Sequence, residues 1–469
     1  MKATTRVGLV LILVGLMVVL SFPGLTGADG GGANVIRGDD CTISLFELGG
    51  DEVTTTDTQS VETPSGNVSL VCRADLPVHL DPPRRTVRTS GELCETPLGP
   101  TTDTVKVITP KGRVRLTCRV NGKPPPTTGW AIGQDATHTP VLVHTADGGQ
   151  TWQVQGDLTA WKGSPGNDIS AVDDRTAWAA LGSSGETGGA ILHTTDGGAT
   201  WVSQVIPPGL HGGIKAVKGL SRREAWAASL GDPTLSGTIL HTTDGGATWN
   251  VVPHPTVPIY QVNRMDAIGN NVWIADCAGP DPIGAVVHTQ DGGLTWRAEH
   301  LPWGGEYEYD SPLTVHAFSP EAVWASGSLI PQPNPVFYRT VDGGVQWERV
   351  INVGANDHLD DICAASPNDV WGALNGGEGQ GRVWRVHVEP DGTPDAQIFS
   401  PPEISGYNAE GITCLDTRVA WVVADAERPV QGKPLGVILH TTDGGETWVQ
   451  QAAPTDVHYW KISFAGARR

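Results

Sequence analysis

The chain has little positive charge, and this shortage limits the partners that it can bind. Its 469 residues include 31 Lys and Arg against 51 Asp and Glu, which gives a formal net charge of -20 at pH 7. A surface that binds nucleic acid needs clustered Lys and Arg, and no such cluster stands out along the sequence. We therefore expect no nucleic-acid partner and no adhesion to anionic lipid, and we attribute the acidity to solubility.

Methionine is also scarce, whereas the residues that make turns are abundant. The sequence has 3 Met but 60 Gly, 35 Pro and 17 Trp. This composition suits short strands joined by many turns, so we predict an all-β chain. Its length leaves room for two or more domains.

Long apolar runs are absent except at the start of the sequence. Lys2 and Arg6 precede an apolar run from Val7 to Phe22, and the small residues 26–28 offer a cleavage site. We predict a signal peptide at 1–28 and a flexible segment at 29–40, hence a secreted or cell-surface protein. The alternative is an uncleaved anchor, although a spanning helix needs roughly 17 to 25 apolar residues.

Tryptophan is missing from residues 41–122, and four of the seven cysteines lie there. Two half-repeats of the form Thr-Pro-x-Gly-x-Val-x-Leu-x-Cys-Arg begin at Thr63 and Thr109, and they alternate apolar and polar residues as half-buried hairpins do. We predict a small β domain over 41–122, which a Pro-rich linker at 123–128 joins to the rest of the chain.

These four cysteines are predicted to form disulfides. In an exported chain the most economical pairing is Cys41 with Cys72 and Cys94 with Cys118, although four cysteines allow three pairings. A zinc site is disfavoured because no Cys-x-x-Cys spacing is present.

A nine-residue stretch, His193 to Trp201, recurs along the rest of the chain. In it an Asp can hydrogen-bond backbone N–H groups across a tight turn, Gly-Gly accepts positive φ, and Thr-Trp begins the return strand. The other copies are 144–152, 241–249, 288–296, 339–347, 440–448 and an eroded one at 384–392. We assign a structural role to the aspartates of these turns, which are Asp147, Asp196, Asp244, Asp291, Asp342, Asp391 and Asp443.

A second periodic signal alternates with the turns. Seven tryptophans lie in strands of small apolar residues: Trp130, Trp178, Trp226, Trp273, Trp324, Trp371 and Trp421. Each unit then has four short strands, which is the pattern of a propeller blade. We predict a seven-bladed β-propeller over 129–469, closed when the C-terminal strand near Ile462–Ala465 completes the first blade.

These motifs carry a resemblance to known families. The Asp-Gly-Gly-x-Thr-Trp turns resemble the Asp boxes of bacterial neuraminidase-type (BNR) repeats. The wider pattern, Ala-Trp-Ala followed by Ile-Leu-His-Thr-Thr-Asp-Gly-Gly-Ala-Thr-Trp, is similar to the photosystem II assembly and stability factor-like family of seven-bladed propellers. The resemblance covers residues 129–469 and implies a scaffold that binds protein during assembly.

The remaining cysteines, Cys277, Cys363 and Cys414, are interpreted as buried small apolar residues. Cys363 and Cys414 fall on the inner strands of neighbouring blades but are offset by one position. We therefore expect them to face opposite sides.

Function in repeat folds lies on the variable loops, so we expect the binding site there. Aromatic and acidic residues gather in two sets of loops that should share the face around the channel mouth, and this mixture suits a protein or a glycan. The alternative is that these aromatic side chains only pack the loops against the blades. The predicted binding residues are Trp161, Tyr260, Trp303, Tyr307, Tyr309, His358, Tyr407 and Trp460.

We expect no metal and no cofactor, and a non-catalytic protein. The alternative is a sialidase-like or other glycoside hydrolase that uses loop carboxylates. Residues 303–310, Trp-Gly-Gly-Glu-Tyr-Glu-Tyr-Asp, place Tyr and Glu together as neuraminidases do, but the arginine trio of those enzymes is missing. Two loop carboxylates within roughly 5 to 10 Å of one another in one pocket would favour the enzyme.

Overall fold

The computed structural model forms two compact units, Met1–Pro125 and Pro126–Arg469. It describes residues 36–46, 55–63, 66–74, 85–96, 102–109, 112–119, 128–183, 189–208, 210, 213–231, 237–254, 257, 259–276, 285–302, 309–330, 335–352, 357–376, 380–426 and 432–465. Within these ranges no helix is both long and apolar enough to span a membrane.

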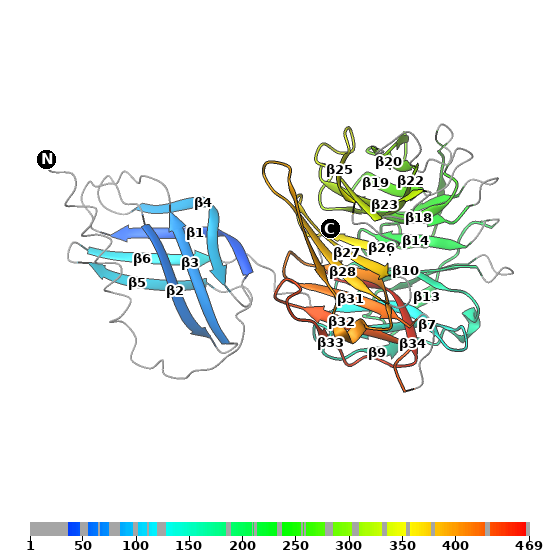
Figure 1. Ribbon diagram of the computed structural model, residues 1–469, viewed down its shortest axis with the longest axis horizontal. Coiled ribbons are helices and arrows are strands. Elements are labelled where there is room, and N and C mark those ends of the chain that lie inside the picture. Colours follow the sequence, from blue (N-terminus) through cyan, green and yellow to red (C-terminus); the bar gives the residue numbers. More distant parts are fainter. Residues whose placement is uncertain are drawn as a thin grey trace. The chain divides into compact units, whose positions relative to one another are not determined.

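The first unit contains one antiparallel sheet with the strand order β2-β3-β4-β1-β6-β5 (Figure 1). Its strands are β1 (Ile36–Phe46), β2 (Thr55–Thr63), β3 (Gly66–Ala74), β4 (Arg85–Thr96), β5 (Thr102–Thr109) and β6 (Gly112–Arg119). Each half-repeat forms a hairpin, β2–β3 and β5–β6, and in each hairpin two residues join the paired ends, as in Thr63 opposite Gly66. The central strands β1 and β4 are exchanged, so that β1 pairs with the hairpin of the other half.

The register of this sheet bears on the four N-terminal cysteines, whose side chains lie outside the described residues. The Cα of Cys41 is opposite that of Cys118, and the Cα of Cys72 is opposite that of Cys94. Directly opposed antiparallel residues are about 4.5 to 5.5 Å apart, which a disulfide can span. Cys41 and Cys72 lie on strands separated by β4. The backbone therefore favours a different pairing from the predicted one.

The second unit confirms the predicted fold: seven four-stranded antiparallel sheets, the blades of a propeller (Figure 1). Blade 1 is β34 (Val457–Phe464), β7 (Gly129–Asp135), β8 (Pro140–Thr145) and β9 (Gln153–Gln155); blade 2 is β10 (Gly166–Ala171), β11 (Ala177–Leu181), β12 (Ala190–Thr194) and β13 (Val202–Ser203). Blade 3 is β14 (Ile214–Gly219), β15 (Ala225–Ser229), β16 (Ile239–Thr242) and β17 (Asn250–Val252); blade 4 is β18 (Val262–Ile268), β19 (Asn271–Asp276), β20 (Ala285–Thr289) and β21 (Arg297–Glu299).

Blades 5 to 7 repeat the same order of strands. Blade 5 is β22 (Tyr309–Ala317), β23 (Val323–Ile330), β24 (Pro335–Thr340) and β25 (Glu348–Asn352); blade 6 is β26 (Asp357–Ala364), β27 (Asp369–Gly376), β28 (Arg382–Val388) and β29 (Pro394–Phe399). Blade 7 is β30 (Asn408–Cys414), β31 (Ala420–Asp425), β32 (Gly436–Thr441) and β33 (Val449–Gln450), and two short 3-10 helices, η1 (Thr159–Trp161) and η2 (Pro402–Ile404), lie in loops. The first strand of each blade is called the inner strand, and the second the Trp strand.

The tryptophan of each Trp strand is buried and packs between blades. Trp178 stacks on His193 of its own blade with ring centroids 3.5 Å apart, and its indole N–H donates to Ser221 O of the next blade. Trp421 of blade 7 donates to Gly148 O in the Asp-Gly-Gly turn of blade 1, at 3.1 Å. A tryptophan hydrogen bond therefore also links the last blade to the first, with its acceptor in a different turn, and β34 supplies the inner strand of blade 1 by pairing with β7.

The Asp-Gly-Gly turns are held by a small hydrogen-bond network. In blade 2, Thr200 donates its backbone N–H and its hydroxyl to the Asp196 carboxylate, at 2.9 and 2.7 Å, and Thr194 Oγ1 donates to the same group at 2.8 Å. These hydrogen bonds lower the pKa of Asp196 to about 2. Gly197 and Gly198 have φ of 79° and 84°, which favour glycine.

Every inner strand contains a β-bulge near its beginning, where one residue is skipped in the register with the Trp strand. The seven skipped residues, called the bulge residues below, are Trp460, Asn167, Lys215, Asn263, Leu313, Asp360 and Glu410 in blades 1 to 7.

The interpretation of Cys363 and Cys414 as separate apolar residues is wrong, because the two form a disulfide between blades 6 and 7. On neighbouring inner strands, the residue three positions after one bulge residue faces the residue four positions after the bulge residue of the next blade. Ser170 Oγ, for example, accepts the backbone N–H of Gly219. Cys363 and Cys414 occupy these two positions, so the offset by one is what brings them together. Cys277 lies outside the described residues.

Candidate functional site

One end of the central channel opens into a cavity of about 290 Å³. All seven bulge residues line it, one from each blade, because a bulge turns its extra side chain away from the regular pleat. Gly166, Arg264, Leu359 and Lys461 complete the lining. This ring of bulge residues with its cavity is called the channel mouth.

The channel mouth lies on the loop-rich face predicted from the sequence. Each bulge is close to the start of its inner strand and opposite the end of the Trp strand, as in the pairing of Gly166 with Leu181. Both sets of variable loops leave the blades at these strand ends. The Asp-Gly-Gly turns join the other strand ends and therefore lie on the opposite face.

Charged side chains brace the floor of the channel mouth. Lys461 Nζ is 3.0 Å from Asp361 Oδ2 and donates to the backbone oxygen of Glu410 at 2.9 Å. Arg264 Nε is 4.0 Å from the other oxygen of Asp361. Burial lowers the pKa of Lys461 and raises the pKa of Asp168, which lies beside these groups. The contacts join blades 1, 4, 6 and 7 at the channel.

The next layer of the channel, away from the mouth, is braced in the same way. Lys218 Nζ of blade 3 is 2.6 Å from Asp266 Oδ1 of blade 4, and Asp266 Oδ2 accepts the backbone N–H of Ala317 in blade 5 at 2.8 Å. Burial favours the neutral form of Asp266, but the charges of Lys218 and His316 and the hydrogen bonds to the carboxylate together outweigh it and hold the pKa of Asp266 below its usual value. The inner strands are therefore fixed to one another by polar contacts, and the cavity above them has a rigid base.

A cluster of carboxyl groups occupies the rim between blades 6 and 7. Burial, with the nearby charges of Asp360 and Asp425, raises the pKa of Glu410 to about 9. Asp425 hydrogen-bonds to Glu410, accepts the indole N–H of Trp460 at 3.4 Å and lies 3.3 Å from His458 Nδ1. At neutral pH Glu410 is therefore protonated, and its hydroxyl donates a hydrogen bond to Asp425.

These groups give the channel mouth a mixed chemistry. Asn167 and Asn263 supply amides, Lys215 and Asp360 supply charges of opposite sign, and Glu410 adds a neutral carboxylic acid. The half-buried ring of Trp460 and the side chain of Leu313 add apolar surface. In the described part of the chain no three His, Cys, Asp or Glu residues are grouped as metal ligands would be. The arrangement suits binding through hydrogen bonds and an aromatic face.

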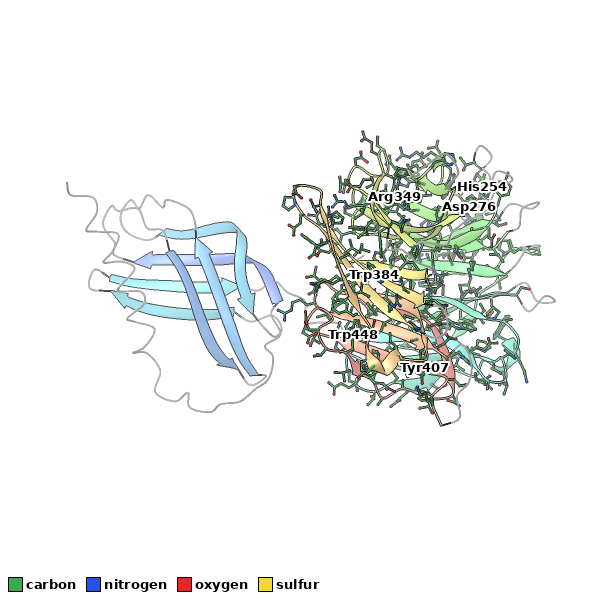
Figure 2. The ribbon with its side chains drawn as sticks, viewed as in Figure 1. His254, Asp276, Arg349, Trp384, Tyr407 and Trp448 are labelled. Carbon is green, nitrogen blue, oxygen red and sulfur yellow. A yellow bond between two sulfur atoms is a disulfide. The ribbon has the colours of Figure 1, made fainter. Side chains whose placement is uncertain are left out.

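The structure places the predicted aromatic residues in different environments. Trp460 lies in the channel mouth as a bulge residue. Tyr407 is only 3% exposed and belongs to the core between blades 6 and 7, where its hydroxyl donates to Pro434 O (Figure 2). Trp161 ends η1 and packs on the core between blades 1 and 2.

Tyr260 lies in a loop that is anchored at both ends. Asp276, at the end of β19, accepts the backbone N–H groups of Tyr260 and Gln261 at 3.0 and 2.7 Å. His254 contacts the backbone oxygens of Val257 and Gly237 at 3.0 Å each (Figure 2). Tyr260 is half-buried in this loop and does not line the cavity.

The other four predicted residues cannot be placed in the site. Trp303 and Tyr307 lie outside the described residues. Tyr309 begins β22 and His358 is the second residue of β26, but their side chains are also outside the described part.

The carboxylates of the channel mouth bear on the enzyme alternative. Glu410 and Asp425 are hydrogen-bonded, which is closer than the roughly 5 to 9.5 Å that separates the two acids of a glycosidase. Glu410 and Asp360 line the same cavity. Of the acids proposed in loop 303–310, Glu306 and Glu308 lie outside the described residues, as does the side chain of Asp310.

A second hollow, of about 700 Å³, opens between blades 2 and 3 on the opposite face. Much of its lining comes from the repeated turns, such as Thr195, Thr200 and residues 244–247. The repeat itself produces this groove, and Arg222 and Arg223 are its distinctive residues. The channel mouth is therefore the better candidate site.

No protein-family model and no curated protein matches the chain. Among solved structures it is similar to YCF48 bound to D1 peptide, at 19% identity over 68% of this chain and 83% of that one, with a TM-score of 0.43. It is also similar to YCF48 from Cyanidioschyzon merolae, at 16% identity over 64% of this chain and 94% of that one, with a TM-score of 0.45. A third similar structure is the GH74 enzyme of Niastella koreensis, at 11% identity over 73% of this chain and 70% of that one, with a TM-score of 0.43. The likeness is one of fold.

Proposed function

We propose that the chain is an exported, non-catalytic binding propeller that engages a protein or glycan partner through the channel mouth. The observation that carries the proposal is the ring of bulge residues. The residue two positions after each bulge is apolar in every blade, for example Ile169 and Val217, whereas the seven bulge residues include amides, charges of both signs, Leu and Trp. The uniform apolar residues maintain the fold, whereas the varied bulge residues, one in each blade, are suited to recognising a ligand.

The chemistry of the channel mouth supports a protein or glycan ligand. Such ligands combine apolar faces with hydrogen-bonding groups, and pockets that hold them combine aromatic surface with a few oriented polar groups. Trp460 supplies the aromatic surface, and its indole N–H is fixed on Asp425. The amide of Asn167 is fixed by donating to Ile214 O of the next blade at 2.7 Å. A preorganised site of this kind loses little entropy on binding.

Rigidity supports a scaffold role like that of assembly factors. The disulfide between Cys363 and Cys414 and the contacts of Lys461 with Asp361 join the blades around the cavity. A partner would meet a surface whose shape is already fixed. The role would then be to hold a partner in position, which needs no chemical step.

Location outside the cytoplasm is part of the proposal. The Cys363–Cys414 disulfide lies between inner strands, and structural disulfides persist mainly in oxidising compartments. The predicted signal peptide at 1–28 points the same way.

A second candidate function, glycoside hydrolysis, is favoured by one observation. Glu410 has a pKa of about 9 and lines the same cavity as Asp360, so a protonated acid and a carboxylate face one pocket. In this function Glu410 would protonate the leaving oxygen and Asp360 would act as the base or nucleophile. The hydrogen bond that ties Glu410 to Asp425 speaks against it.

The test is a binding screen of the full chain on a glycan array and on a displayed random-peptide library. Trp460→Ala and Lys215→Ala should weaken the binding that the wild-type protein shows, by at least ten-fold for Trp460→Ala. Leu294→Ala is the matched control, because Leu294 is 85% exposed in a turn on the opposite face, and it should bind normally. Equal binding by all variants would refute the site. Glycoside hydrolysis that is lost in Glu410→Gln would establish the second candidate instead.

A further inference from the structure

The sheet of the first unit gathers cations that are dispersed in the sequence. In hairpin β5–β6, Lys106 is opposite Arg115 and Thr102 is opposite Arg119. Since alternate residues of a strand share a face, Arg113, Arg115 and Arg119 lie on one face together with Lys106. Arg88 of β4 joins this face, because it and Thr117 of β6 are both opposite Thr42 of β1. We call this set the basic face: Arg88, Lys106, Arg113, Arg115 and Arg119.

The hairpin does not need these cations to form. Its other face carries the alternating apolar residues Val105, Val107, Val114 and Leu116, which are those that a half-buried hairpin requires. Folding requires polar residues on the basic face, but it does not require that they be cations.

The first half-repeat provides an internal comparison. Hairpin β2–β3 has the same Thr-Pro-x-Gly turn and pairs over nine residues of each strand, against eight in hairpin β5–β6. Where Lys106 opposes Arg115 in one hairpin, Ser60 opposes Ser69 in the other. Like charges directly opposite one another destabilise a sheet, whereas paired serines do not. An anion lying over both cations would remove the repulsion.

The charge of this region also departs from that of the whole chain. Residues 85–119 carry seven Lys and Arg against three Asp and Glu, a formal charge of +4, whereas the whole chain carries -20. One acidic residue, Asp40 of β1, is opposite Arg119 on the basic face. Along β6, alternate residues are about 7 Å apart, so Arg113 to Arg119 form a row of about 20 Å. A row of this length on an otherwise acidic protein matches a linear, flexible polyanion.

We propose that the basic face is a second binding site, which takes an acidic polysaccharide along the β6 strand. A carboxylated sugar chain can place successive charges over the row, and the apolar face of the sheet stays available for packing. The choice of polysaccharide over nucleic acid rests on the proposed export of the chain. It does not depend on the channel mouth, so the two sites can fail separately.

The experiment measures binding of the full chain to immobilised polygalacturonate at ~10 mM and ~300 mM salt, where screening lengths differ several-fold. The variant Lys106→Ser/Arg113→Asn/Arg115→Ser introduces the residues of the first half-repeat. The matched control, Lys106→Arg/Arg113→Lys/Arg115→Lys, keeps every charge. At low salt we expect the first variant to bind roughly ten-fold more weakly, which corresponds to about 1.4 kcal/mol shared among the three lost ion pairs.

The charge-retaining control should bind like the wild type, and high salt should release the polymer from both. Trp460→Ala should bind polygalacturonate normally, which separates this site from the channel mouth. Unchanged circular dichroism would show that the half-repeat variant folds, and the single change Arg113→Asn offers a milder test. No binding at low salt, equal binding by the half-repeat variant, or tighter binding to duplex DNA or anionic vesicles than to polygalacturonate would overturn the proposal.

Discussion

The disulfide between blades 6 and 7 gives the sharpest test of how the ring is held together. Cys363 and Cys414 are 51 residues apart in the chain, and closing a loop of that length removes about 4 kcal/mol of chain entropy from the unfolded state. The double variant Cys363→Ser/Cys414→Ala reproduces the contact seen between blades 1 and 2, where Ser463 Oγ accepts the N–H of Ala171 at 3.0 Å. That hydrogen bond returns about 1 kcal/mol, so the net loss is about 3 kcal/mol.

This loss translates into a modest change in melting temperature. Unfolding entropy of roughly 2.1 cal/mol/K per residue, over the unit Pro126–Arg469, gives a fall in Tm of about 4 °C. Differential scanning calorimetry of the oxidised proteins measures it. A reductant should lower the propeller transition of the wild type to slightly below that of the variant, because the thiols lack the serine hydrogen bond, and should leave the propeller transition of the variant unchanged. A variant that melts like the oxidised wild type would refute the argument that the disulfide replaces a weaker contact.

Three further predictions concern the rim, the first unit and ring closure. Burial raises the pKa of Glu410 from 4.5 to about 9, so between these pH values the native state holds a proton that the unfolded state lacks. The free energy of unfolding should therefore fall as pH rises from about 5 to 9. Glu410→Gln should flatten this slope in denaturant titrations, and an unchanged slope would contradict the assignment. Non-reducing peptide mapping should find Cys41 joined to Cys118 and Cys72 to Cys94, as the register favours; the pairs Cys41–Cys72 and Cys94–Cys118 would show that the sheet order is different. Deleting residues from His458 onward removes β34 and exposes the edge of β7, so the protein should aggregate, and a truncated protein that melts normally would contradict closure by this strand.

The sequence predicts the propeller well because the strands of each blade are marked by recurring motifs. A turn motif and a Trp strand recur in every unit, so an error in one blade is corrected by the others. The disulfide escapes prediction for a physical reason. Alternation within one strand says which side a residue faces, but it says nothing of the stagger between neighbouring inner strands, and that stagger brings Cys363 to Cys414.

The candidate site is predicted less completely than the fold. A bulge adds one residue to a strand and leaves no mark in the hydrophobic period, so Asn167, Lys215, Asn263, Leu313 and Glu410 do not stand out as a set. Aligning the repeats on the apolar residue two positions later would reveal them. Tyr407 shows the opposite error, because an aromatic residue in a loop can also be part of the core.

The channel mouth as the binding site is the central claim, and one comparison tests it most directly. For the ligand that the wild-type chain selects from the glycan array or peptide library, the dissociation constants of Trp460→Ala and Leu294→Ala are measured beside that of the wild type by isothermal titration calorimetry. We predict that Trp460→Ala weakens binding at least ten-fold, since loss of a central aromatic contact commonly costs about 2 kcal/mol or more, whereas Leu294→Ala binds like the wild type. Unchanged affinity in Trp460→Ala together with weaker binding in Leu294→Ala would place the site on the opposite face and contradict the account.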